Sequence, residues 1–270
     1  MIEISNLSKT FNMGTVNEVN ALCNISCTIE EGSFVVLLGT NGSGKSTLLN
    51  AVAGNFLPDS GRIQLDGIDI TRMSEHKRAK YIGRVFQNPF SGTAPDMSIA
   101  ENLSLASKRG KYRSLGWALP TTIIQEFREK VKPLNMGLED RLDSPIGKLS
   151  GGQRQALTLL MATWIKPKLL LLDEHTAALD PRTASKVIQL TKEVVEKDRL
   201  TTMMVTHSMQ QAVSLGDRIL MLHNGRIVLE FAGQEKQRLK SNDLLALFDE
   251  IRKKEKIDTP TAEMINQLYV

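Results

Sequence analysis

The stretch GTNGSGKST, residues 39–47, has the residue types and the spacing of a phosphate-binding loop. It fits the pattern G-x-x-x-x-G-K-[ST], in which glycines allow backbone N–H groups to turn inward around a phosphate. A helix that begins at Lys45 would point its positive end at the same anion. A flexible glycine loop is the alternative, and the apolar strand pattern before the loop and the helical pattern after it favour phosphate binding. We predict nucleotide contacts from Gly39, Thr40, Asn41, Gly42, Ser43, Gly44, Lys45, Ser46 and Thr47.

A pair of carboxylates follows an apolar run in LLLLDEH, residues 169–175. An ionised carboxylate resists burial, so we expect Asp173 and Glu174 to lie where the run emerges from a core. Asp173 can then hold Mg²⁺ through water, and Glu174 can orient or deprotonate an attacking water. An exposed turn would explain an isolated Asp-Glu pair equally well. The presence of a phosphate-binding loop elsewhere in the chain favours the functional interpretation.

Four short apolar runs predict the strands that would position these groups, namely SFVVLL (33–38), YIGRVF (81–86), KLLLL (168–172) and TTMMV (201–205). Helical patterns separate several of them, and this alternation indicates a largely parallel sheet covered by helices. Gln87 follows the second run and His207 follows the fourth. Because ligands bind outside the carboxyl ends of parallel strands, we expect the polar groups after the four strands to converge on one crevice. The start of the chain and residues 62–70 favour additional strands joined by glycine turns.

Residues 88–165 have helical patterning and no convincing strand, which predicts an inserted helical lobe. Near its end, Leu149–Gln153 (LSGGQ, the LSGGQ loop below) opens an apolar helix that continues to about Ile165. Ser150 and Gln153 have the spacing of a capping box, so a well-capped helix is one interpretation. The two glycines between them leave backbone N–H groups uncovered at a positive helix end, which also fits a second anion site without its own lysine. Two phosphate cradles in one chain suggest a site shared between two copies.

The C-terminal part predicts one more helix, near residues 242–253, in which Asn242 can cap the first turn. Its apolar stripe is expected to pack on the protein's own core, although a partner surface also fits, and consists of Leu244, Leu245, Phe248 and Ile251. The basic run KRGKYR (108–113) is expected to be a solvated loop, with lipid headgroups or a partner as alternatives.

Composition is that of an ordinary soluble protein of 270 residues, with 41% hydrophobic and 24% charged side chains. Nothing approaches eighteen consecutive apolar residues, and the start lacks a basic leader with an apolar stretch, so we expect neither a membrane span nor a secretion signal and place the chain in the cytoplasm. The formal charge of +4 permits an anionic partner, but a solvated surface explains it. Cys23 and Cys27 lack a second pair of ligands and are expected to be reduced.

The order GTNGSGKST, Gln87, LSGGQ, LLLLDE, AALD and His207 resembles the ATP-binding subunit of the ABC transporter family over about residues 1–230. The resemblance implies an α/β fold, with a P-loop NTPase core of largely parallel sheet flanked by helices, an antiparallel β subdomain and the inserted helical lobe. The implied core comprises residues 1–87 and 166–230, the helical subdomain residues 88–165, and a C-terminal helical extension residues 231–270. The implied cofactors are ATP and Mg²⁺.

The same resemblance implies a head-to-tail dimer, in which the LSGGQ loop of one copy closes over ATP held by Lys45 of the other. The residues that would contact the nucleotide in this way are Ser150, Gly151, Gly152 and Gln153, and Asp180 in AALD would communicate across the interface. Glu174, His207 and Gln87 would be catalytic, with His207 at the γ-phosphate. Mg²⁺ would be held by Ser46, by Gln87 and, through water, by Asp173. Phe11 matches the aromatic position that stacks on adenine, and a core position explains it equally well.

One departure from the family pattern is His175, which stands where most members have proline after the catalytic glutamate. We interpret it as a variant of the turn, with a proton carrier as the alternative. The variant resembles a subgroup of bacterial uptake systems that work with a lipoprotein receptor. The implied partners are a second copy, an integral membrane permease and indirectly the extracytoplasmic receptor, without nucleic acid. The implied location is peripheral, on the inner face of the cell membrane, and residues 90–103 would line the groove that receives the permease.

Two other functions remain open beside ATP-driven uptake of a small solute such as an amino acid. A non-transport ABC ATPase of a soluble metal-cluster assembly complex has the same motifs. A DNA-repair or chromosome-organising ATPase is disfavoured, because that class separates the two motif halves by long coiled coils or zinc modules that this sequence lacks.

Overall fold

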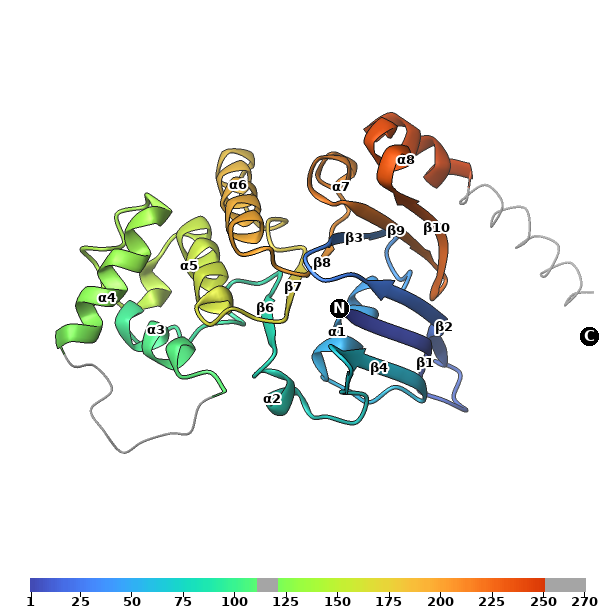
Figure 1. Ribbon diagram of the computed structural model, residues 1–270, viewed down its shortest axis with the longest axis horizontal. Coiled ribbons are helices and arrows are strands. Elements are labelled where there is room, and N and C mark those ends of the chain that lie inside the picture. The colour runs from blue at the N-terminus through green and yellow to red at the C-terminus, as the bar shows by residue number, and fades with distance from the viewer. Residues whose placement is uncertain (111–120, 251–270) are drawn as a thin grey trace, which may run out of the picture.

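The computed structural model describes residues 1–110 and 121–250 as two sheets, flanking helices and a helical lobe (Figure 1). The larger sheet has the order β10-β9-β3-β8-β7-β6, and its strands are β3 (Phe34–Gly39), β6 (Ile82–Val85), β7 (Leu169–Asp173), β8 (Thr202–Val205), β9 (Arg218–His223) and β10 (Arg226–Ala232). All neighbouring pairs are parallel except β10 with β9. The four strands predicted from the apolar runs are therefore confirmed.

The smaller sheet is antiparallel, with the order β2-β1-β4-β5. Its strands are β1 (Ile2–Phe11), β2 (Val19–Ile29), β4 (Ser60–Leu65) and β5 (Ile68–Asp69). One hydrophobic core lies between this sheet and the larger one and encloses helix α1 (Lys45–Ala53). The predicted α/β architecture with an antiparallel β subdomain is confirmed.

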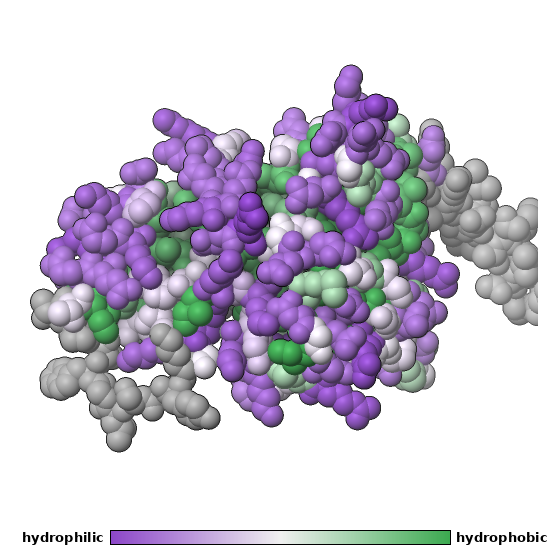
Figure 2. All heavy atoms as spheres, viewed as in Figure 1, coloured by the Kyte–Doolittle hydropathy of each residue, from purple (hydrophilic) through white to green (hydrophobic). Residues whose placement is uncertain are grey.

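A second core covers the opposite face of the larger sheet, under α6 (Pro181–Asp198) and α7 (Met209–Leu215). The central strands are buried on both faces, which explains why they read as unbroken apolar runs rather than as alternating patterns. Helix α6 is amphipathic, with Val187, Thr191 and Val195 turned inward and a polar outer surface (Figure 2). Short helices α2 (Glu75–Arg78) and α8 (Gly233–Arg238) lie at the periphery.

The inserted lobe is helical, as predicted, and has its own hydrophobic core. Its elements are α3 (Ile99–Ser107), α4 (Thr121–Val131), α5 (Gly151–Thr163) and two 3₁₀ turns, Lys132–Leu134 and Ile146–Lys148. Within the described part of the lobe, strand pairing is limited to one bridge between Ser98 and Pro145. Along residues 1–110 and 121–250, no helix combines the length and apolar character needed to cross a bilayer.

Arg109 corrects the expectation of a solvated basic loop at residues 108–113. Its half-buried guanidinium donates hydrogen bonds to the carbonyl oxygens of Ala162 and Ile165, 2.7 and 2.5 Å away, at the end of α5. A cation at this position satisfies carbonyl groups that have no partner inside the helix. Residues 111–113 of the run lie outside the described residues.

The C-terminal helix differs in two details from the sequence prediction. It already includes residue 241, so Asn242 does not cap it, and the Asp243 carboxylate instead accepts a hydrogen bond from the Lys240 backbone N–H (2.9 Å). Leu244 and Phe248 are buried in the second core, as expected, but Leu245 is 49% exposed. Leu247 packs there instead, because residues three and four positions apart share one helix face. Ile251 lies outside the described residues.

Candidate active site

The phosphate-binding loop connects the carboxyl end of β3 to the start of α1, as the motif predicts. Gly42 and Gly44 have positive φ angles of 79° and 98°, a conformation that favours glycine. A side chain at Gly39 would place its Cβ 2.3 Å from the backbone oxygen of Leu222, so this glycine allows a close approach of β3 to β9. The loop is therefore shaped by backbone constraints inside the chain.

Lys45 supplies a buried cation at the centre of this loop. Its ammonium group donates hydrogen bonds to the carbonyl oxygens of Gly39 and Thr40, at 2.9 and 2.7 Å. Burial lowers the pKa of the ammonium group, and the nearby carboxylates of Glu174 and Asp173 raise it in opposition. The lysine is thus already positioned at the helix N-terminus, where an anion is favoured.

The strand register brings the other predicted groups to the same edge of the sheet. Val205 on β8 is paired with both Asp173 on β7 and Leu37 on β3, and β7 also pairs with β6. Since these strands are parallel and aligned, the residues that follow them meet beside the phosphate-binding loop. The convergence expected for Gln87, Asp173, Glu174 and His207 is observed.

Asp173 lies at the end of β7 next to the loop. The Ser46 hydroxyl donates a weak hydrogen bond to its carboxylate (3.4 Å), and the Arg84 guanidinium lies 3.5 Å from it. Burial raises the pKa of Asp173, Arg84 lowers it and Glu174 raises it further. The described residues contain no cluster of three or more His, Cys, Asp and Glu side chains that would form an all-protein metal cage. A hydroxyl beside one carboxylate instead fits Mg²⁺ held largely by phosphate and water.

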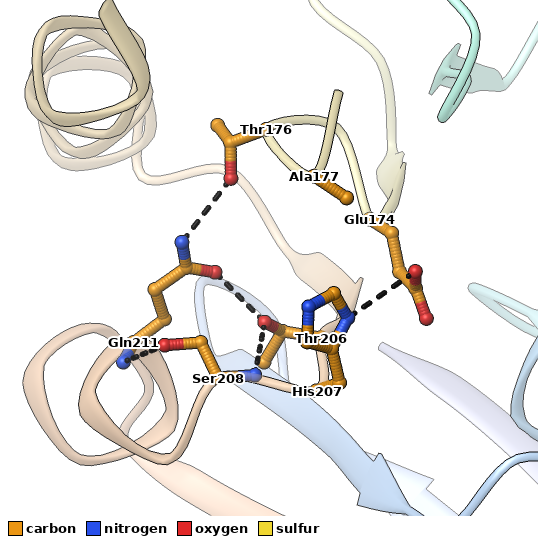
Figure 3. Close-up of a pocket in the computed structure, with 7 residues that line it drawn as sticks. All are labelled: Glu174, Thr176, Ala177, Thr206, His207, Ser208 and Gln211. Carbon is orange, nitrogen blue, oxygen red and sulfur yellow. Dashed lines mark hydrogen bonds and ion pairs between the residues drawn. The ribbon is translucent and has the colours of Figure 1, made fainter. Parts of the chain in front are cut away.

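Glu174 is the point at which the site's side chains meet. Its backbone has a φ angle of 42°, which is uncommon for a residue with a side chain, and its N–H donates to the carbonyl oxygen of Val205 (3.0 Å). Its carboxylate accepts a hydrogen bond from the Gln87 amide (3.2 Å). The same carboxylate lies 3.4 Å from Nδ1 of His207 (Figure 3). The side chain of His207 is 62% exposed, whereas that of Glu174 is 18% exposed. The strained backbone holds the carboxylate at the mouth of the crevice.

A polar network behind this pair was not recognised in the sequence. Gln211 on α7 donates a hydrogen bond from its amide to the Thr176 hydroxyl (3.1 Å) and accepts one from the Thr206 hydroxyl (2.7 Å). Ser208 completes the network at the start of α7 (Figure 3). A sequence signal for this network is the polar run after β8, in which Gln211 stands four positions after His207 and within the short helix α7.

His175 points away from the pocket. It is only 2% exposed and its Nε2 lies 3.0 Å from the Thr191 hydroxyl on α6. That hydroxyl donates to the carbonyl oxygen of Val187 (2.8 Å), so it accepts a hydrogen bond from the Nε2–H of His175. Burial lowers the pKa of His175 to about 4. This placement agrees with the interpretation of His175 as part of the turn and not as a proton carrier.

The LSGGQ loop forms the predicted capping box at the start of α5. The Ser150 hydroxyl accepts from the Gln153 backbone N–H (3.3 Å), and the Gln153 side chain accepts from the Ser150 backbone N–H (3.2 Å). Ser150 and Gly151 are exposed, whereas Gly152 is buried against Thr183 of α6. The loop belongs to the helical lobe, and the side-chain hydrogen bonds of Ser150 and Gln153 stay within that lobe. The structure of one chain therefore leaves the shared-site prediction as a prediction.

Asp180 lies at the start of α6 and Phe11 at the end of β1, and their proposed roles stay predictions. The Asp180 carboxylate caps α6 by accepting from the Thr183 backbone N–H (3.1 Å), and hydrogen bonds from the side chain and the backbone of Thr183 lower the pKa of Asp180. Phe11 ends β1, half-buried, and packs edge-to-face on Phe56 with ring centroids 5.3 Å apart. Lys9 lies 5.6 Å from the Phe11 ring. Phe56 and Lys9 were not identified from the sequence.

Comparisons with known proteins give consistent results. A model of the ABC transporter family matches residues 22–177. The chain is 44% identical over 252 residues to the tyrosine transport ATP-binding protein of Clostridioides difficile, covering 92% of this chain and 99% of that protein. It is 34% identical to the methionine import ATP-binding protein MetN of Carboxydothermus hydrogenoformans, over 85% of this chain and 66% of that one. A solved dimeric ATP-binding cassette with bound ADP and Pi has a TM-score of 0.73 at 32% identity, covering 86% and 98% of the two chains.

Proposed function

The chain belongs to the ABC transporter family, and from this premise we propose that it is the ATP-hydrolysing subunit that powers a membrane permease for uptake of a small solute. The chain is an ATPase, and its relatives are ATP-binding subunits of import systems. One observation carries the proposal for the site: the Glu174 carboxylate lies within hydrogen-bonding reach of Gln87 and close to His207, beside the cation of Lys45.

The proposed roles follow from this geometry. The phosphate-binding loop and Lys45 bind the β- and γ-phosphates, and Glu174 orients and accepts a proton from the attacking water. His207 contacts the γ-phosphate, and Gln87 holds the carboxylate of Glu174 in place. Ser46, Gln87 and, through water, Asp173 would hold Mg²⁺, which would neutralise phosphate charge. Phe11 would stack on adenine.

A second copy would complete each site. The LSGGQ loop offers backbone N–H groups at the start of α5 without a cation of its own, so it fits a phosphate already neutralised by Lys45 of another copy. One of the similar solved structures is a dimeric cassette with ADP and Pi. Closure of two copies around two nucleotides, with Asp180 at the interface, and their release after hydrolysis would supply the two states that drive a permease.

The surface formed by residues 90–103 is the proposed permease contact. It follows Gln87 directly, and it runs into α3 through the capping box of Ser98 and Glu101. Phe90 is 48% exposed there. We place the subunit on the cytoplasmic face of the membrane, with an extracytoplasmic receptor as an indirect partner and no nucleic acid. We also propose that the ATP-binding domain ends near residue 230 and that the C-terminal extension begins there.

An amino acid is the favoured cargo, because the similar C. difficile and C. hydrogenoformans proteins are named for tyrosine transport and methionine import. A soluble metal-cluster assembly ATPase is the alternative. Co-purification with a multi-span permease after gentle lysis supports the transporter, and a purely soluble complex supports the alternative.

Glu174→Gln tests the proposed site. The amide keeps the size of the side chain but cannot accept a proton, so we expect ATP hydrolysis to fall by about 100-fold or more. ATP binding should remain, and the variant should elute as a dimer in ATP and as a monomer without it. The matched variant Glu193→Gln changes an exposed carboxylate on α6 and should behave as the wild type. Normal hydrolysis by Glu174→Gln would refute the role of Glu174.

A further inference from the structure

A single amide connects two loops that lie far apart in the sequence and flank the proposed site. Gln211 and Thr176 are 35 positions apart, yet the Gln211 amide donates to the Thr176 hydroxyl (3.1 Å). The same side chain accepts from the hydroxyl of Thr206 (2.7 Å). Thr176 belongs to the turn after Glu174, and Thr206 directly precedes His207. The side chain therefore spans the pocket that contains the Glu174–His207 contact (Figure 3).

The hydrogen-bond directions leave little freedom in this bridge. The Thr206 hydroxyl accepts from the Ser208 backbone N–H (3.1 Å) while it donates to Gln211. Thr206 and Thr176 are 3% and 7% exposed, so water competes poorly for either hydroxyl. A change at Gln211 leaves both hydroxyls without their present partner.

Capping of α7 does not explain the Gln211 side chain. The cap is made by Ser208, whose hydroxyl accepts from the Gln211 backbone N–H (3.3 Å). This contact uses only the main chain of Gln211. The side-chain amide of Gln211 instead forms its hydrogen bonds with the two threonines, one on each side of the pocket.

We propose that Gln211 is a positioning residue for ATP hydrolysis, which holds the loop of His207 and the turn of Glu174 at a fixed separation through Thr206 and Thr176. The inference rests on the proposed function and deepens it. The Gln211 amide bonds to Thr206 and Thr176 and so acts on His207 and Glu174 through the backbone of the two loops. A displacement of about 1 Å at a reacting group can lower a rate by about 100-fold.

Gln211→Ala tests the bridge by steady-state ATPase kinetics. We expect kcat to fall about tenfold or more, with KM for ATP changed by less than about twofold, because the phosphate-binding loop is not altered. Gln211→Glu should retain kcat within about threefold, since both threonine hydroxyls can donate to a carboxylate. Gln210→Ala is the matched control, because Gln210 is the exposed neighbour on the same helix and should match the wild type.

Thr176→Val breaks the same bridge from its other end without touching α7. It should reproduce the loss of kcat with unchanged KM, and it keeps the test valid if Gln211→Ala unfolds, which the melting temperature reports. In a His207→Ala background, Gln211→Ala should cause a smaller further loss than it causes alone, because the His207 contact that Gln211 positions is already removed there.

Three outcomes would overturn the inference. They are a wild-type kcat in both Gln211→Ala and Thr176→Val, a loss that appears in KM instead of kcat, and a full multiplicative loss when Gln211→Ala is combined with His207→Ala. Failure of the proposed function is distinguishable, because then Glu174→Gln would hydrolyse ATP normally whatever the Gln211 variants do.

Discussion

The phosphate-binding loop and the LSGGQ loop are both glycine-rich starts of helices, but only the first has its own cation for an anion. The start of α1 carries a buried cation, Lys45, and faces the carboxylates of Asp173 and Glu174. The start of α5 has no cation in its loop, and its exposed Ser150 hydroxyl is already used in the capping box. The core thus builds a receptor for a charged phosphate group, whereas the lobe offers a weaker anion site.

The two loops are also held differently. The phosphate-binding loop follows a buried strand, and the β3–β8–β7 register fixes what faces it. The LSGGQ loop is held by its own capping box, by a hydrogen bond from the Gln153 amide to the carbonyl oxygen of Met136 (3.1 Å) and by packing of Gly152 on α6. One loop is therefore complete in a single chain, and the other is suited to a surface supplied from outside.

The strongest test of this contrast uses mixed subunits. Lys45→Ala removes the cation of one loop, and Ser150→Asp keeps a good helix cap while placing a negative charge at the other. We expect each variant alone to lose about 100-fold or more in ATPase rate, because every shared site is damaged. An equimolar mixture should recover about a quarter of the wild-type rate, since half of randomly formed dimers contain one intact site of two.

The contrary results of the mixing test are equally specific. A Ser150→Asp protein with the wild-type rate would show that the LSGGQ loop does not face nucleotide. A mixture that stays inactive, although native mass spectrometry detects heterodimers, would contradict a site built from Lys45 of one copy and Ser150 of the other.

A smaller effect is expected from adding one carbon to a glycine in each loop. A Cβ at Gly152 would lie 1.9 Å from the Thr183 Cγ2 atom, so Gly152→Ala should cost about 1–3 kcal/mol of unfolding free energy. Thr183→Ser removes that methyl group and should restore most of the loss in the double variant. Gly39→Ala meets the backbone oxygen of Leu222, which no side-chain change can remove. Chemical denaturation of the three variants measures this difference.

Equal behaviour of the two glycines would break the comparison. If Thr183→Ser fails to rescue Gly152→Ala, the constraint at the LSGGQ loop lies in the backbone, as it does at the phosphate-binding loop. Thr183→Ser alone is the control, and it should change stability by much less than Gly152→Ala does.

The contrast also explains how much could be predicted from the sequence. The phosphate-binding loop, the four strands and the capping box of Ser150 and Gln153 were predicted, because each depends on residues close in the chain. The meeting of Gln87 with Glu174 followed from a general property of parallel sheets. These features need no knowledge of individual side-chain directions.

The missed features depend on side-chain direction and strand register. The Gln211 bridge joins two loops that are distant in the sequence and that the pairing of β7 with β8 brings side by side. The exposure of Leu245 depends on which face of the C-terminal helix packs on the core, and Leu244, Leu247 and Phe248 occupy that face. A polar residue after a strand also gives no sign of whether it faces the pocket, like Thr176, or the core, like His175.

The smallest expected effect on activity concerns His175, which anchors the turn of the completed site. Its pKa of about 4 in the folded chain lies below the ordinary value of about 6.5 in the unfolded chain. The unfolded state therefore binds more protons between these values, and stability is fully present above about pH 6.5 and falls as the pH drops toward 4. The depressed pKa corresponds to about 3 kcal/mol lost over that range.

His175→Gln separates the titration of the imidazole from the hydrogen bond to Thr191 that anchors the turn. The glutamine amide can donate to the Thr191 hydroxyl but carries no titrating proton, so the acid-dependent loss should shrink by about 3 kcal/mol in urea denaturation of the nucleotide-free, magnesium-free protein. ATPase activity at pH 7.5 should remain within about twofold, because His175 points away from the pocket. Thr191→Val should instead destabilise at every pH, since it leaves the buried Nε2–H without an acceptor. Identical acid profiles for His175→Gln and the wild type would mean that the buried imidazole does not anchor the turn in its neutral form. The core would then lose one of the constraints that distinguish it from the lobe.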